Sequence, residues 1–163
     1  MKEILLPYAS YHLWANQQLI ATIENLPPGL AEAEVKSSFN SLAKTLLHMW
    51  DAESIWWQRL KLQEKITRPS DEFRGTAAQI GQSLLQQDKQ WLDWITQAQE
   101  RSLQHEFIYQ NTKKEMFKQP VWQMLLHLFN HGTYHRGQVV TMLRQLDVSK
   151  IPATDYIVFS RKK

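Results

Sequence analysis

The 163-residue chain contains no cysteine. Disulfide bonds, thiolate zinc sites, iron–sulfur clusters and a cysteine nucleophile are therefore excluded. A metal ion bound by this chain must be held by imidazole, carboxylate or water ligands. The six histidines are the first residues to examine for such a role.

Glycine and proline are scarce, with five and six residues, whereas 43% of the residues are apolar. This composition excludes a disordered chain and a collagen-like repeat. No apolar run approaches the roughly 20 residues that a membrane-spanning helix needs. Residues 1–7 are also too short and interrupted to form a secretory signal. We expect a single domain over residues 1–163, located in the cytoplasm and without a membrane partner.

The chain also has almost no excess of positive over negative residues. The formal net charge is +3, but Arg161, Lys162 and Lys163 end the chain, and the remaining residues include 16 basic and 16 acidic ones. A nucleic-acid-binding domain carries a basic stripe on its folded surface. Because the charge of the body is balanced, we expect no nucleic-acid partner.

Four long segments have the three- and four-residue apolar spacing of amphipathic helices. The first ends before Pro27-Pro28-Gly29, because proline blocks helical geometry. The second runs from about Ser41 to Glu64, with Asn40 or Ser41 as its N-cap. The third begins at a capping box, Thr76-Ala77-Ala78-Gln79, and the fourth begins at Pro120. Four such helices, each about 20–27 residues long, predict an all-α four-helix bundle.

A short segment before the last long helix has a different pattern. Phe107-Ile108-Tyr109 and Met116-Phe117 flank the turn-prone sequence Gln110-Asn111-Thr112-Lys113. Apolar and aromatic residues on both sides of such a turn predict a short hairpin or an irregular segment. After the last helix, residues 156–159 form a short apolar tail.

The fourth helix contains three histidines, His127, His131 and His135, spaced four residues apart. They span about 80° of the helix surface, and Gln138 falls in the same sector. Two histidines at i and i+4 can bind one divalent ion, but this spacing alone also fits packing residues. Because His127 and His135 lie about 12 Å apart along the axis, they cannot easily share an ion. A metal site made of two adjacent histidines of this helix and a third ligand from another helix fits the geometry better. His48 is the candidate for that third ligand.

Two other polar residues lie on apolar helix faces. Glu53 continues the apolar stripe of the second helix, where an unpaired carboxylate is costly. It can orient a ligand imidazole, act as a base or bond a neighbouring helix. His12 lies on the apolar face of the first helix, and we interpret it as a hydrogen-bonded core histidine. We expect His105 to be a loop residue.

Two motifs together resemble those of a known family. The last helix contains the pattern NH-x-x-x-H-R-G-Q from Asn130, and the second contains H-x-x-x-x-E-x-x-W from His48. Residues 11–16 and 154–157 resemble the opening and closing patterns of the same family. By these motifs the chain resembles the DinB family, also called DinB/YfiT-like, over nearly its whole length.

The resemblance implies a four-helix bundle, often a homodimer, with a three-histidine site for a divalent metal ion such as zinc or nickel. Carried over to this sequence, the ligands are His48, His131 and His135. His127 would then be a packing residue or lie just outside the ligands. Some members of the family are thiol transferases that use bacillithiol or mycothiol, some are thiol-dependent isomerases, and many have no assigned reaction. The family name refers to induction by DNA damage.

Our leading functional hypothesis is a metal-dependent enzyme acting on a small molecule. Three neutral imidazoles leave open positions on an ion, which can lower the pKa of bound water toward ~7 or bind an external low-molecular-weight thiol as thiolate. The reaction would be thiol transfer or hydrolysis. The alternative is a non-catalytic dimeric metal-binding protein of a stress response. A fourth protein ligand, with His12 or Glu53 as candidates, would favour that alternative.

Overall fold

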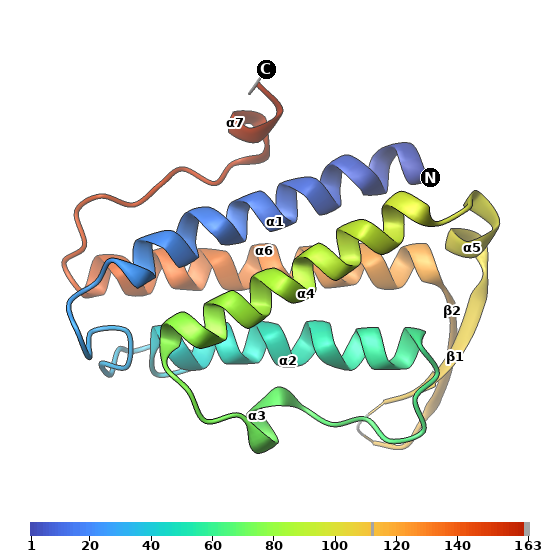
Figure 1. Cartoon of the computed structure of the whole chain (residues 1–163), viewed down its shortest axis with the longest axis horizontal. Coiled ribbons are helices and arrows are strands. Elements are labelled where there is room, and N and C mark those ends of the chain that lie inside the picture. Colours follow the sequence, from blue (N-terminus) through green and yellow to red (C-terminus); the bar gives the residue numbers. More distant parts are fainter. Residues whose placement is uncertain (112, 162–163) are drawn as a thin grey trace.

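A computed structural model describes residues 1–111 and 113–161 of the chain. Within these residues, four long helices form a bundle, and a two-stranded sheet and three short helices lie at its ends and edges (Figure 1). The all-α four-helix bundle predicted from the sequence is confirmed. The elements are α1 (Lys2–Glu24), α2 (Leu42–Leu60), α3 (Pro69–Glu72), α4 (Ala77–Gln97), α5 (Glu100–Gln104), β1 (Glu106–Gln110), β2 (Met116–Pro120), α6 (Val121–Gln145) and α7 (Tyr156–Ser160).

Helix α2 begins as predicted but ends four residues earlier. The Ser41 side chain caps its start by accepting a hydrogen bond from the Lys44 amide. The predicted end at Glu64 is wrong because Leu62 adopts a left-handed conformation, with φ of 54°. The amides of Leu62 and Gln63 then donate to the carbonyls of the last helical turn, which closes the helix at Leu60.

The other long helices begin or end at or near the signals in the sequence. The capping box of α4 forms, with Thr76 and Gln79 bonding each other's backbone amides. Pro120 does not begin α6 as predicted; it is the N-cap, with ψ of 146°, because it still pairs with Glu106 in the sheet. Helix α1 ends at Glu24, before the proline pair.

The predicted hairpin before α6 is confirmed. Strands β1 and β2 pair antiparallel, from Glu106 opposite Pro120 to Gln110 opposite Met116. The Asn111 side chain accepts hydrogen bonds from the amides of Lys113 and Glu115, which shapes the turn. Thr112 of the predicted turn lies outside the described residues. The short helices α3, α5 and α7 were not predicted, because four or five residues are too few to show a helical period.

Each of the four long helices packs against two of the others. Helix α1 packs against α4 and α6, and α2 packs against the same two helices. Figure 1 shows α1 and α6 running in one direction and α2 and α4 in the other. The histidines of α2 and α6 therefore belong to directly neighbouring helices, which the sequence left open.

A buried polar layer divides the core into two apolar clusters. One cluster gathers around Leu19, Leu46 and Leu84, and the other around Trp91 and Leu125. Each fully buried leucine contributes about 1.5–3 kcal/mol to folding. Between the clusters, all four long helices contribute buried polar side chains: His12, Asn16, Glu53, Asp88 and Arg136.

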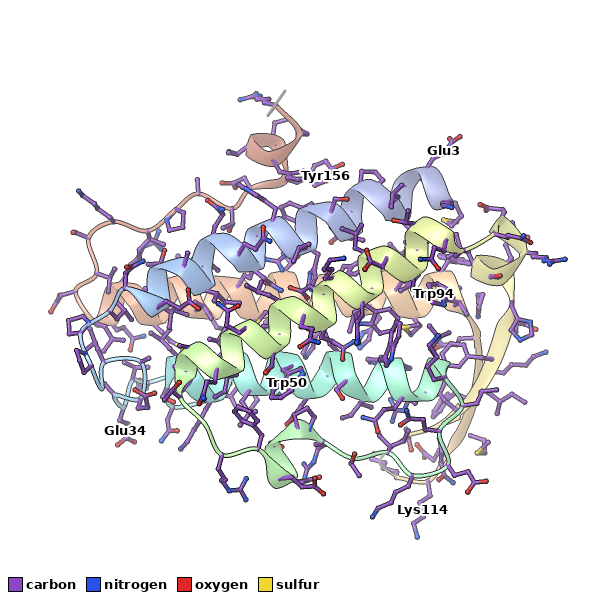
Figure 2. The ribbon with its side chains drawn as sticks, viewed as in Figure 1. Glu3, Glu34, Trp50, Trp94, Lys114 and Tyr156 are labelled. Atoms are coloured by element: carbon purple, nitrogen blue, oxygen red, sulfur yellow. The ribbon has the colours of Figure 1, made fainter. Side chains whose placement is uncertain are left out.

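The outer faces of the bundle are polar. Figure 2 shows Glu3, Glu34 and Lys114 extending away from the helices, and all three are exposed. Over residues 1–111 and 113–161, no helix combines the length and the apolar character needed to cross a membrane. The polar outer faces and the two apolar clusters agree with the amphipathic pattern from which the helices were predicted.

Candidate metal centre

Three histidines from two neighbouring helices converge at one point beside the polar layer. His131 Nε2 lies 3.1 Å from His48 Nε2 and 3.0 Å from His135 Nε2. His131 and His135 occupy successive turns of α6, whereas His48 comes from α2. Each imidazole thus turns the same ring nitrogen toward a common centre, with His131 in the middle.

The electrostatics of this group suit a cation. Burial lowers the pKa of all three imidazoles, and the pKa of His131 falls to about 3 because the neighbouring histidines, His135 and His48 first, add to the effect of burial. The rings are therefore neutral at neutral pH, each with a free electron pair to offer. Their ligand atoms lie within 4.8 Å of one another, so the group can hold a divalent metal ion.

Neighbouring side chains fix two of the three rings. His135 Nδ1 donates to Gln138 Oε1 over 2.7 Å, which leaves Nε2 unprotonated and facing the centre. Gln138 in turn donates to Ser38 Oγ over 3.1 Å. The ring of Phe39 stacks on that of His48, with 4.2 Å between the ring centres. The segment before α2 therefore helps to orient the histidines.

A Gln138→Ala variant is expected to bind metal about 10–100-fold more weakly, because His135 loses the partner that fixes its tautomer and orientation. Competition with a chromogenic chelator measures this change. Gln145→Ala is the matched control, since Gln145 also joins α6 to the segment before α2, through Lys36 O, but lies away from the histidines. Equal affinity of the Gln138→Ala variant and the wild type would contradict this role.

A second group with metal-ligating side chains lies inside the polar layer. His12, Glu53 and Asp88 are each no more than 2% exposed, and their ligand atoms also lie within 4.8 Å of one another. His12 Nε2 lies 2.9 Å from Glu53 Oε1 and 3.2 Å from Asp88 Oδ1. Asn16 donates to Asp88 over 2.8 Å, and Arg136 donates to His12 Nδ1 over 3.1 Å.

This second group already balances its own charges. Burial opposes a charge on His12, whereas the Asp88 and Glu53 carboxyls raise its pKa to about 9. Arg136 can only donate, however, so His12 Nδ1 accepts from it and the single ring proton lies on Nε2, facing the carboxyls. Burial and the nearby Asp88 carboxylate raise the pKa of Glu53 to about 8, so Glu53 is protonated at neutral pH. Burial opposes ionisation of Asp88, but the hydrogen bonds from His12, Glu53 and Asn16 lower its pKa. The charge of Arg136 offsets that of Asp88, so the three histidines are the stronger metal candidate.

Comparison with known proteins places the whole chain in one family. The model of the DinB family matches residues 1–162. The chain belongs to the DinB family. Protein DinB of Bacillus subtilis (strain 168) is 27% identical to it over 165 residues, which cover 96% of this chain and 93% of that protein. The match spans all four long helices and both groups of metal-ligating side chains.

The structure places the remaining histidines of this DinB-family chain apart from the convergent three. His127 lies one turn before His131, with 6.1 Å between the ring centres, and its ring packs against Trp56. His12 is a hydrogen-bonded core histidine, as predicted. His105 is exposed and lies between α5 and β1, as predicted. Of the three roles considered for Glu53, its contact with His12 corresponds to bonding a neighbouring helix.

Four residues around the two groups were not predicted from the sequence. Asp88 carries a signal that was available, because it interrupts the apolar stripe of α4 between Leu84 and Trp91 as Glu53 does in α2. Asn16 and Arg136 have no such signal, since arginine and asparagine are common on helix surfaces. Phe39 precedes α2 in a segment without regular structure, where periodicity gives no orientation.

Proposed function

We propose that this protein is a metal-dependent enzyme in which His48, His131 and His135 hold a divalent ion, zinc or nickel. The observation that carries the proposal is the convergence of three neutral Nε2 atoms, with no fourth protein ligand in residues 1–111 and 113–161. Among the described residues, the group of potential ligands around this point contains these three histidines and no carboxylate. Three protein ligands with an open position are typical of catalytic zinc sites, whereas structural sites have four.

When bound, such an ion supplies a Lewis acid with positions left for water or a thiol and for the substrate. The protein contributes the neutral imidazoles and, through Gln138, the fixed orientation of His135. Tyr134, whose ring lies 5.0 Å from that of His135, is 63% exposed and offers an aromatic surface to a small substrate. The reaction class is transfer of an external low-molecular-weight thiol to an electrophile, or hydrolysis.

The proposal is tested by turnover of chloro-nitroaromatic and epoxide electrophiles with several low-molecular-weight thiols, and of ester substrates without thiol. We expect turnover that disappears on treatment with a chelator and returns when zinc or nickel is added. The same assay on a His48→Ala variant should give no metal-dependent turnover. An experimental structure in which four protein ligands fill the coordination shell of the metal ion would contradict the catalytic proposal. It would favour a non-catalytic metal-binding protein.

The homodimer implied by the family resemblance is part of the same proposal. Ile4, Tyr156 and Ile157 leave apolar surface exposed on α1 and α7, which pack together. Apolar surface of this kind is a candidate subunit contact. Light scattering on the purified protein distinguishes a dimer from the 19.3 kDa monomer.

A further inference from the structure

A cavity of about 610 Å³ lies between the end of α2, the segment that follows it, and the β-hairpin. Figure 2 shows Lys114 at the turn of this hairpin, on the side of the bundle where α2 ends. Arg59 lines the cavity and follows His48 on α2 by about 16 Å along the helix axis. The cavity is thus separate from the three histidines, and its volume is in the range of small-molecule sites.

Among the residues that the structure describes, the Arg59 guanidinium has no anionic partner. No carboxylate lies within 4.0 Å of it in residues 1–111 and 113–161, although the side chain is half-buried. Its Nη2 donates to Gln110 O over 2.9 Å, while Nε is buried without a hydrogen-bond partner in the same residues. A partly desolvated charge of this kind is costly until an anion pairs with it.

Two aromatic rings hold this cation in place. The guanidinium carbon lies 4.6 Å from the centre of the Trp56 ring and 5.3 Å from that of Tyr109. These cation–π contacts stabilise the arginine but leave its planar set of donors without a carboxylate or phosphate. The other arginine of the cavity, Arg68, is different because it is paired with Asp71 over 2.7 Å.

One part of the cavity lining is apolar and exposed to solvent. Leu62 is 73% exposed, Met116 is 63% exposed and Ile108 is 57% exposed, and Ile66 completes the apolar wall. Single exposed apolar side chains are ordinary, but several around one cavity indicate a ligand with an apolar body. Glu64 is the lining carboxylate that lacks an ion pair in the described residues, and it is exposed.

We propose that this cavity binds a small organic carboxylate, with its carboxylate on Arg59 and its apolar body against Leu62, Ile108 and Met116. A carboxylate matches the planar donors of the guanidinium and supplies the missing negative charge. The apolar body covers side chains that water now contacts. This site goes beyond the proposed enzymatic function, since it does not depend on a metal ion at the histidines.

Isothermal titration calorimetry with octanoate, octanamide and acetate tests the proposal on the full chain. We expect octanoate to bind more tightly than octanamide, which lacks the charge, and than acetate, which lacks the apolar body. Arg59→Gln should weaken octanoate binding about tenfold or more, because a charge-assisted contact is lost. Ile108→Ser should also weaken it. Lys61→Gln is the matched control and should leave the affinity unchanged, since Lys61 also lies at the end of α2 and stacks on a tryptophan, Trp57, but does not line the cavity.

The same titration in a His131→Ala background separates this site from the proposed metal centre, because octanoate binding should persist there. Circular dichroism confirms that each variant is folded. Absence of octanoate binding to the wild type, equal affinity for octanamide, or undiminished binding to the Arg59→Gln variant would each overturn the proposal.

Discussion

Replacing His131 with alanine is expected to leave the purified protein without a bound metal ion. His131 is the middle member of the three histidines, with its Nε2 about equally close to the Nε2 atoms of His48 and His135. Removing it leaves two nitrogens from different helices. Loss of an outer partner alone weakens metal sites about 10–100-fold, so loss of the central ligand should weaken this one by more than that. Metal analysis of the purified variant measures the result.

His127→Ala is the matched control for this experiment. It removes a histidine from the same face of α6, one turn away, whose ring packs against Trp56 and lies apart from the convergent nitrogens. We expect this variant to retain the metal content of the wild type. His48→Ala and His135→Ala should behave like His131→Ala. Wild-type metal content in any of these three variants, or its loss in His127→Ala, would contradict the assignment.

Replacing Asp88 with alanine is expected to destabilise the fold by about 3–5 kcal/mol, the range for removing one partner of a buried charge pair. Asp88 is 2% exposed, accepts from Asn16 and lies 3.2 Å from His12, which bonds Arg136 on its other side. Its removal leaves a buried arginine without compensation and an asparagine without an acceptor. Denaturation in urea, followed by circular dichroism, measures the free energy of unfolding.

Asp93→Ala is the control for Asp88→Ala, because it removes a carboxylate from the same helix. Asp93 pairs with Lys89 over 2.6 Å, but both side chains are more than half exposed, so solvent screens the pair and its loss should change stability little. If Asp88→Ala lowered the free energy of unfolding no more than Asp93→Ala does, the polar layer would not contribute to stability as we infer.

The Asp88→Ala variant also distinguishes the two groups of metal-ligating side chains. Under conditions where it is folded, it should retain metal, because its carboxylate belongs to the second group and not to the three histidines. Loss of metal from folded Asp88→Ala, together with retention in His131→Ala, would instead assign the ion to His12, Glu53 and Asp88.

The fold was largely predictable because amphipathic periodicity and end signals are local. The capping box at Thr76 and the hairpin before α6 formed as expected. The end of α2 was not predictable, since the left-handed conformation of Leu62 depends on surroundings that the apolar pattern does not encode. The short helices were missed for a related reason, because one turn carries no period.

The candidate site was predictable in part. The i, i+4 spacing on α6 limited which histidines can share an ion, and His48 was the candidate third ligand from another helix. The polar layer was not predicted as a unit, because it assembles single residues from all four long helices. Glu53 and Asp88 can each be noticed as a carboxylate on an apolar stripe, but nothing local shows that His12 lies between them.

The missing cysteine and the positions of six histidines established, from sequence alone, which ligand types a metal site in this chain can use. Tertiary structure decided the rest. It placed α2 beside α6, so that three Nε2 atoms converge, and it placed His12 against Arg136, Glu53 and Asp88. The reason is physical: periodicity fixes the face of a helix on which a residue lies, whereas the partner of that face depends on how all four helices pack.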